Sequence, residues 1–167
     1  GSFTTGIMLM GIAFFYGATG SFTLNALPIV PTTGMINPSF LHVGGLLLLF
    51  VAMSFKVSAA PFHFWTPDVY DGAPSVFTSF MATIVKAAGF IAFIRLFQTQ
   101  AVALGPTWKI ILSIVIILTL LIGNITAVFQ QSVKRMLAYS SIAQAGFMLF
   151  ALFSSNDLAI EGILLYS

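Results

Sequence analysis

Two lysines in strongly apolar surroundings are the residues of this chain best suited to chemistry. Lys56 stands in VAMSFKVSAA and Lys86 in MATIVKAAGF. A charged side chain at the centre of a bilayer costs at least ~2.5 kcal/mol, so such residues are usually kept for function. A low-dielectric surrounding disfavours the ammonium form, which lets a buried lysine lose and regain a proton. We therefore predict that both lysines are buried and transfer protons; a structural role, with the ammonium bound to carbonyls or a carboxylate, is the alternative.

His63 is the third candidate for proton transfer. It follows Lys56 by about two helical turns, although Pro61 interrupts the helix between them. Imidazole changes protonation close to physiological pH, so His63 could relay a proton between the lysine and water. A hydrogen-bonded structural histidine is the alternative. The other histidine, His42, stands near a helix start and is expected at the membrane interface.

The composition indicates an integral membrane protein. Of the 167 residues, 59% are hydrophobic and only 6% are charged, whereas a soluble domain usually carries about 25% charged residues. The net charge of +2 is too small to favour nucleic acid as a partner. The chain has no cysteine, which excludes disulfides and thiolate sites for metals or iron–sulfur clusters. The lipid bilayer is the expected surrounding.

The apolar runs predict an all-α polytopic protein with about six transmembrane helices. The expected helices cover residues 5–24, residues from 40 through Lys56 with an interruption near Pro61, and residues 74–98, 108–130 and 136–153, with a sixth beginning after Asp157. That last run stops after about ten residues, whereas a spanning helix needs ~20. We therefore expect the sequence to be an internal piece of a longer chain.

The segment after Lys56 predicts a broken helix. Pro61 removes a backbone donor and leaves the Val57 carbonyl without its helical partner. Open backbone at membrane depth is tolerated only inside protein or beside a water-filled cavity, and transporters place broken helices at their ion sites. A simple kink is the alternative. Residues 65–72 are expected to form a turn at the membrane interface, with Asp71 capping the next helix.

The spacing also predicts the depth of the lysines. Lys86 lies midway between Pro74 and Gln98, about 18 Å from each, which places it near the membrane midplane. A loop after Lys56 would return the chain so that both lysines lie at similar depth on neighbouring helices. Basic residues near helix ends are equally divided between the two sides, so they do not predict an orientation.

Two long stretches closely resemble a known family. They are FKVSAAPFHFWTPDVYDGAPSVFTSFMATIVKAAGF and GNITAVFQQSVKRMLAYSSIAQAGFMLFAL, and both are similar to subunit N of bacterial NADH-quinone oxidoreductase, or respiratory complex I. The stretch FFYGATGSF is similar as well, so the resemblance covers nearly the whole chain. The wider family includes the other antiporter-like subunits of complex I and the Mrp-type sodium/proton antiporters. The form PDVYDGAP favours subunit N among them.

The resemblance implies an antiporter-like fold of about fourteen helices built from two inverted repeats. Residues 1–167 would be one membrane segment, helices six to eleven of that fold. Lys56 and His63 would belong to its broken helix and Lys86 to the helix after it. Asp71 and the pair Lys134-Arg135 would face the cytoplasm. A glutamate partner of Lys56 would lie before Gly1, and a further lysine beyond Ser167.

The resemblance also implies a function, a location and partners. The chain would be a non-redox, proton-translocating subunit of the enzyme NADH:quinone oxidoreductase, working with its other membrane subunits in the bacterial plasma membrane. It would bind no cofactor itself, and NADH, FMN, iron–sulfur clusters and quinone would belong to other subunits. The alternative is a subunit of an Mrp-type cation/proton antiporter. A third possibility is a membrane subunit whose lysines only hold helices together.

Overall fold

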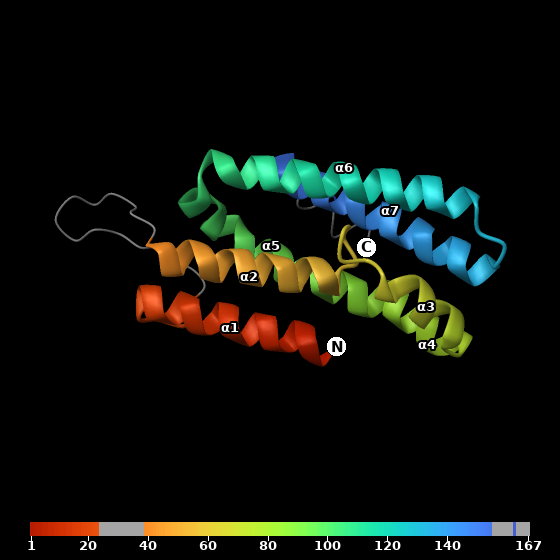
Figure 1. The fold of residues 1–167 in the computed structure, drawn as a ribbon, viewed down its shortest axis with the longest axis horizontal. Helices are drawn as coiled ribbons and strands as arrows, with labels where there is room; N and C mark the ends of the chain where they lie inside the picture. The colour runs from red at the N-terminus through yellow and green to blue at the C-terminus, as the bar shows by residue number, and fades with distance from the viewer. Residues whose placement is uncertain (24–38, 155–161, 163–167) are drawn as a thin grey trace.

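The computed structural model describes residues 1–23, 39–154 and 162, and the regular structure there is entirely helical. Its elements are α1 (Ser2–Thr19), α2 (Phe40–Lys56), α3 (Trp65–Gly72), α4 (Ser75–Phe80), the π-helix η1 (Met81–Val85), α5 (Lys86–Leu104), α6 (Pro106–Val128) and α7 (Val133–Ser154) (Figure 1). The all-α prediction is confirmed for this part of the chain. The sixth helix expected after Asp157 lies outside the described residues.

Three of the described helices are long and apolar enough to cross a membrane. They cover Ser2–Thr19, Ser75–Gln100 and Pro106–Val128, and α2 is a shorter apolar helix. The second of these spans joins α4, η1 and α5 into one continuous rod. The structure therefore agrees with the membrane assignment made from composition.

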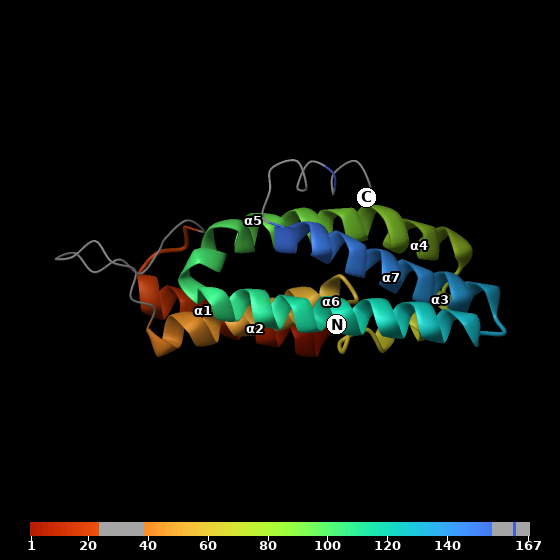
Figure 2. The same ribbon diagram turned by 90° about the horizontal axis from the view of Figure 1, so that it is seen from above.

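The helices form two antiparallel pairs with the continuous α4–η1–α5 rod between them. Helix α1 packs along α2, and α6 packs along α7 (Figures 1 and 2). Helix α5 contacts α2 on one side and α6 on the other, while the short α3 packs on α7. The rod that carries Lys86 thus contacts helices from both halves of the chain, while most of its span is not buried inside the bundle.

Small residues allow the paired helices to approach closely. A Cβ on Gly45 of α2 would lie 2.9 Å from the backbone N of Phe15 and 3.0 Å from the carbonyl O of Gly11, both on α1. Between α6 and α7, a Cβ on Gly123 would lie 2.8 Å from the backbone N of Ala143. Both contacts are too close for any side chain, as is common where membrane helices pack.

An aromatic cluster fixes the central rod against its neighbours. Phe97 of α5 stacks on Trp108 of α6 with ring centroids 4.8 Å apart, and Phe50 of α2 meets Trp108 edge-on at 5.3 Å. Phe93 of α5 completes the cluster through an edge contact with Phe50 at 5.8 Å. All four side chains are buried. Their packing holds α2 and α5 in a defined register, and these are the helices that carry Lys56 and Lys86.

Residues 65–72 form the helix α3, so the prediction of an interface turn is wrong. Pro67 falls in the first turn of this helix, where its missing N–H breaks no helical hydrogen bond. The Trp65 indole Nε1 donates to the carbonyl O of Phe55 at 2.9 Å and ties the start of α3 to the end of α2. His42, expected near the membrane interface, is the third residue of α2 and is fully buried beside Phe15 of α1.

Polar contacts join α3 to the start of α7 at one end of the bundle. Arg135 forms an ion pair with Asp68, and Ser132 Oγ donates to Asp71 Oδ1 at 2.9 Å. Lys134 Nζ donates to the carbonyl O of Ala73 at 3.1 Å.

Asp71 thus contacts α7, and Pro74 takes the N-cap position of α4. The resemblance correctly placed the Asp71 segment and Lys134-Arg135 at the same end. Because the Arg135 and Asp68 side chains are 40% and 73% exposed, their pair contributes only about 0–1 kcal/mol.

Candidate functional site: a buried lysine beside a broken helix

Lys86 lies near the middle of the apolar span Ser75–Gln100 and is only 6% exposed, as predicted. The π-helix η1 ends at Val85, directly before it. A π-turn closes its hydrogen bond over five residues, so it shifts the face on which the following side chains lie, and such turns are common at functional sites. In this protein, the shifted rod directs Lys86 toward α7.

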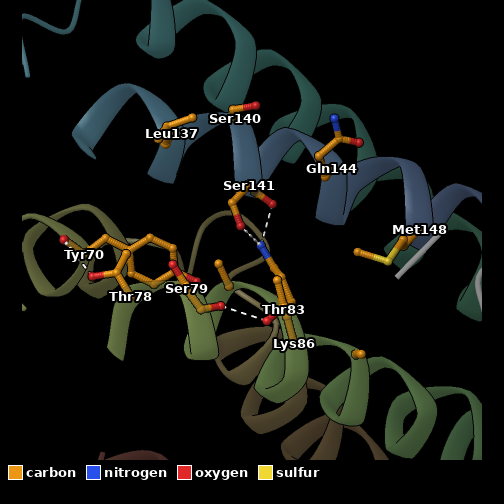
Figure 3. A pocket seen from close by; sticks show the side chains of 12 residues that line it. Tyr70, Thr78, Ser79, Thr83, Lys86, Leu137, Ser140, Ser141, Gln144 and Met148 are labelled. Atoms are coloured by element: carbon orange, nitrogen blue, oxygen red, sulfur yellow. Dashed lines mark hydrogen bonds between the residues drawn. The ribbon is translucent and has the colours of Figure 1, made fainter. Parts of the chain in front are cut away.

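The ammonium group of Lys86 is bound by one residue of α7. Its Nζ donates to Ser141 Oγ at 2.6 Å and to the backbone carbonyl O of the same residue (Figure 3). The acids within the described residues are Asp68 and Asp71, and both contact the start of α7 at the bundle end. Within that part of the chain, Lys86 therefore has oxygen acceptors but no carboxylate counter-ion.

A cavity of about 530 Å³ opens beside Lys86, between α7 and the α3–α4–η1 segment. It is lined by six further hydroxyl or amide side chains: Tyr70, Thr78, Ser79, Thr83, Ser140 and Gln144. Figure 3 shows the Tyr70 ring pointing into this space, and its hydroxyl also interacts with the Ser141 side chain. A water molecule takes ~30 Å³ of liquid volume, so the cavity is large and polar enough for several waters.

Lys56 is exposed on this chain, and the prediction that it is buried is therefore wrong for the described residues. It is the last residue of α2, and its side chain lines an open groove of about 310 Å³ between the first turns of α1 and the α2–α3 region. Its aliphatic stem nevertheless lies against α5. A Cβ on Gly89 would be 3.9 Å from Lys56 Cγ, and Gly89 is one helical turn after Lys86. The predicted placement of the two lysines at similar depth on neighbouring helices is consistent with this contact.

His63 lies in the break between α2 and α3 and is 7% exposed. Its ring contacts Phe64 at 4.8 Å and Tyr139 of α7 at 6.4 Å between centroids. Its Nδ1 is buried, and the imidazole has a hydrogen bond to the backbone of Pro61. His63 does not line the Lys86 cavity. The three candidates thus have different surroundings: Lys56 lines an open groove, Lys86 lines the polar cavity, and His63 is buried in the break. The stem of Lys56 contacts α5, the helix that begins at Lys86.

The break itself is held by side chains rather than by a regular helix. Ser58 has a positive φ of 65°, and Thr66 Oγ1 donates to its Oγ at 2.6 Å. The backbone N of Ala60 donates to Thr119 Oγ1 of α6 at 2.9 Å. Thr119 is fully buried. A hydroxyl from another helix thus takes the place of a helical acceptor, as open backbone at membrane depth requires.

We expect Thr119→Val to destabilise the protein by about 1–3 kcal/mol. Valine has nearly the same shape but leaves the buried N–H of Ala60 without an acceptor, and that is the usual cost of an unmade buried hydrogen bond. The measurement is thermal unfolding of the complete protein in detergent, with Thr119→Ser as the variant that keeps the hydroxyl. Equal midpoints for the wild type and Thr119→Val would contradict the assignment.

Sequence reasoning did not single out Thr119 or Ser141. The first is one hydroxyl inside the apolar run IVIILTLLIG, and the second is one of several polar side chains on α7. Their partners lie 59 and 55 positions away along the chain. The sequence shows that apolar helices carry hydroxyl groups. It does not indicate which backbone group or which lysine each hydroxyl contacts.

The whole chain, residues 1–167, matches the family model described as NADH:quinone oxidoreductase/Mrp antiporter, TM. It is 47% identical over 166 residues to NADH-quinone oxidoreductase subunit N of Salinibacter ruber, covering 99% of this chain and 33% of that protein. A chain of respiratory complex I from Thermus thermophilus, solved with bound Aureothin, aligns with a TM-score of 0.77 and 40% identity over 99% of this chain and 35% of the other.

A chain of the Mrp complex from Dietzia sp. aligns with a TM-score of 0.83 over 98% of this chain and 30% of the other, but with only 20% identity. That similarity shows a shared fold. The chain thus spans about a third of the length of the relatives it matches. The helical fold agrees with the family model, which matches residues 1–167, and this chain therefore belongs to the NADH:quinone oxidoreductase/Mrp antiporter membrane family.

Proposed function

We propose that this chain is the central part of a proton-translocating membrane subunit of an NADH:quinone oxidoreductase. It would correspond to helices six to eleven of the antiporter-like fold, in the bacterial plasma membrane. One observation carries the proposal: Lys86 is buried in the middle of an apolar span, faces a polar cavity and has no carboxylate partner among the described residues. A lysine without a fixed counter-ion in such a place can exchange a proton with its surroundings.

The proton route would pass from Lys56 to Lys86. The stem of Lys56 lies against α5 one turn from Lys86, and its end lies in an open groove. A change in the charge beside that groove would alter how well Lys56 holds its proton, and the proton would then pass toward Lys86. His63 would assist reloading from water at the break, because it lies in the break and imidazole changes protonation close to physiological pH.

The complete enzyme would carry its redox chemistry in other subunits. This chain has no cysteine, so it offers no thiolate for an iron–sulfur cluster. NADH, FMN, the clusters and quinone would bind elsewhere in the complex, and this chain would work with the neighbouring membrane subunits. Its relative in Salinibacter ruber is named as a subunit of NADH-quinone oxidoreductase, which supports that assembly.

An Mrp-type cation/proton antiporter subunit is the second candidate function. It is supported by the shared family model and by the similar fold of the Mrp chain from Dietzia sp.. The identities favour the first candidate: 47% to subunit N of Salinibacter ruber and 40% to the complex I chain from Thermus thermophilus, against 20% to the Mrp chain.

Reconstitution of the complete complex in liposomes tests the proposal. NADH oxidation with quinone should drive proton movement into the lumen, measured with a pH-sensitive dye, and it should continue at the same rate in sodium-free buffer. A protonophore serves as the control, since it should abolish the gradient and leave NADH oxidation running. Proton exchange that needs sodium but neither NADH nor quinone would overturn the proposal in favour of the antiporter.

A further inference from the structure

We infer that the Ser141 hydroxyl is the positioning group for Lys86, holding its nitrogen in place whether the lysine is protonated or neutral. The inference rests on the proposed role of Lys86 in proton transfer and adds a residue to it. Ser141 lies on α7, a helix that holds none of the three residues predicted to transfer protons.

The contact is specific to one residue. Nζ of Lys86 is bound by both the Oγ and the backbone carbonyl of Ser141, and by no other residue for which the structure gives a hydrogen bond. The neighbouring Ser140 lines the same cavity, but its side chain points away from Nζ in Figure 3. Ser141 is reached across the bundle, from α5 to α7. Lys86 is therefore held by the packing of two helices rather than by a local turn.

The two acceptors of Ser141 differ in what they can do. A carbonyl oxygen only accepts hydrogen bonds, whereas a hydroxyl both accepts and donates. An ammonium group has three donors and no acceptor, but a neutral amine has a lone pair that can accept. By rotating its hydrogen, Ser141 Oγ can accept from the ammonium and then donate to the lone pair of the neutral amine. When Nζ gives its proton to water in the cavity, the nitrogen keeps a partner and need not move.

The rest of the cavity supports this assignment. The other titratable side chain that lines it is Tyr70 of α3, which also interacts with the Ser141 side chain. The side chains of α4 and η1 that line the cavity carry only hydroxyl or apolar groups, including those of Thr78 and Thr83. Thr83 Oγ1 donates to the carbonyl O of Ser79 in its own helix at 2.8 Å. Among the described charged residues, only Lys86 lines this space. Ser141 is thus the group best placed to respond to its protonation.

The test compares Ser141→Ala, Ser141→Thr and the control Ser113→Ala in the complete complex, reconstituted in liposomes; the Ser113 hydroxyl of α6 donates to the carbonyl O of Ile110 in its own helix and does not line the cavity. NADH-driven proton uptake is measured across a pH series and divided by the amount of assembled complex. Losing a hydrogen bond to a charged group changes an equilibrium by about tenfold or more. We expect Ser141→Ala to slow proton uptake about tenfold and to change the shape of the pH profile. Ser141→Thr, which restores the hydroxyl, should recover most of the rate, and Ser113→Ala should match the wild type.

Two results would overturn the inference. One is proton uptake by Ser141→Ala that matches Ser113→Ala at every pH, because the hydroxyl would then have no role. The other is equal slowing by Ser141→Ala and Ser141→Thr, because the effect would then be steric. Lys86→Met separates this inference from the proposed function: if that variant loses proton uptake while Ser141→Ala keeps it, only the role of Ser141 fails.

Discussion

Lys86→Met should stop proton transfer through this segment, with at least a tenfold loss of NADH-driven proton uptake, while the complex still assembles. Methionine fills a similar volume with an unbranched apolar side chain, so the packing between α5 and α7 is kept. It has no ionisable group, so the polar cavity loses the one charged residue that lines it among the described residues. The expected phenotype is a correctly assembled membrane arm with a severe transport defect.

Two further variants make this prediction specific. Lys86→Arg keeps the positive charge but cannot release its proton at physiological pH, so it should be as impaired as Lys86→Met. Lys109→Met removes an exposed lysine near the start of α6 and should pump normally. Normal proton uptake by Lys86→Met would show that this lysine is structural, and so would full activity of Lys86→Arg.

Gly123→Leu should prevent stable assembly, because no side chain fits between α6 and α7 at this position. A Cβ there would lie 2.8 Å from the backbone N, 3.0 Å from the Cα and 3.1 Å from the Cβ of Ala143. These atoms belong mainly to backbone, which cannot turn away as the end of a flexible side chain can. Overpacking usually costs about 1–3 kcal/mol, and a clash with backbone should reach or exceed the top of that range. Separating the helices would also move Ser141 away from Lys86.

The amount of assembled complex in the membrane is the measurement for this variant, followed by thermal unfolding of whatever assembles. Gly17→Leu is the matched control, because Gly17 is also helical but a Cβ on it would have nothing within 4 Å. It should assemble as the wild type does. Wild-type amounts of Gly123→Leu with unchanged unfolding would contradict the close packing of α6 against α7.

The local features of the fold could be predicted from the sequence because their signals lie within a few residues. Apolar runs of about 20 residues predicted the helices, and α2 begins at the predicted residue but ends at Lys56, before the predicted interruption near Pro61. Pro61 predicted the break after Lys56. A predicted turn at residues 65–72 proved to be helix α3, because Pro67 occupies its first turn and Trp65 reaches back to Phe55. That contact depends on the shape of the break, which the pattern of residue types does not specify.

Composition, apolar runs and prolines were enough to predict a helical membrane protein with two lysines and a histidine beside a broken helix. The contacts of those residues follow only from the packing of the helices: Ser141 for Lys86, an open groove for Lys56 and Tyr139 for His63. Composition and prolines act locally, whereas contacts between residues more than fifty positions apart depend on how each helix is rotated. One π-turn before Lys86 changes that rotation for the whole of α5, and close glycine contacts fix the distance between the helices.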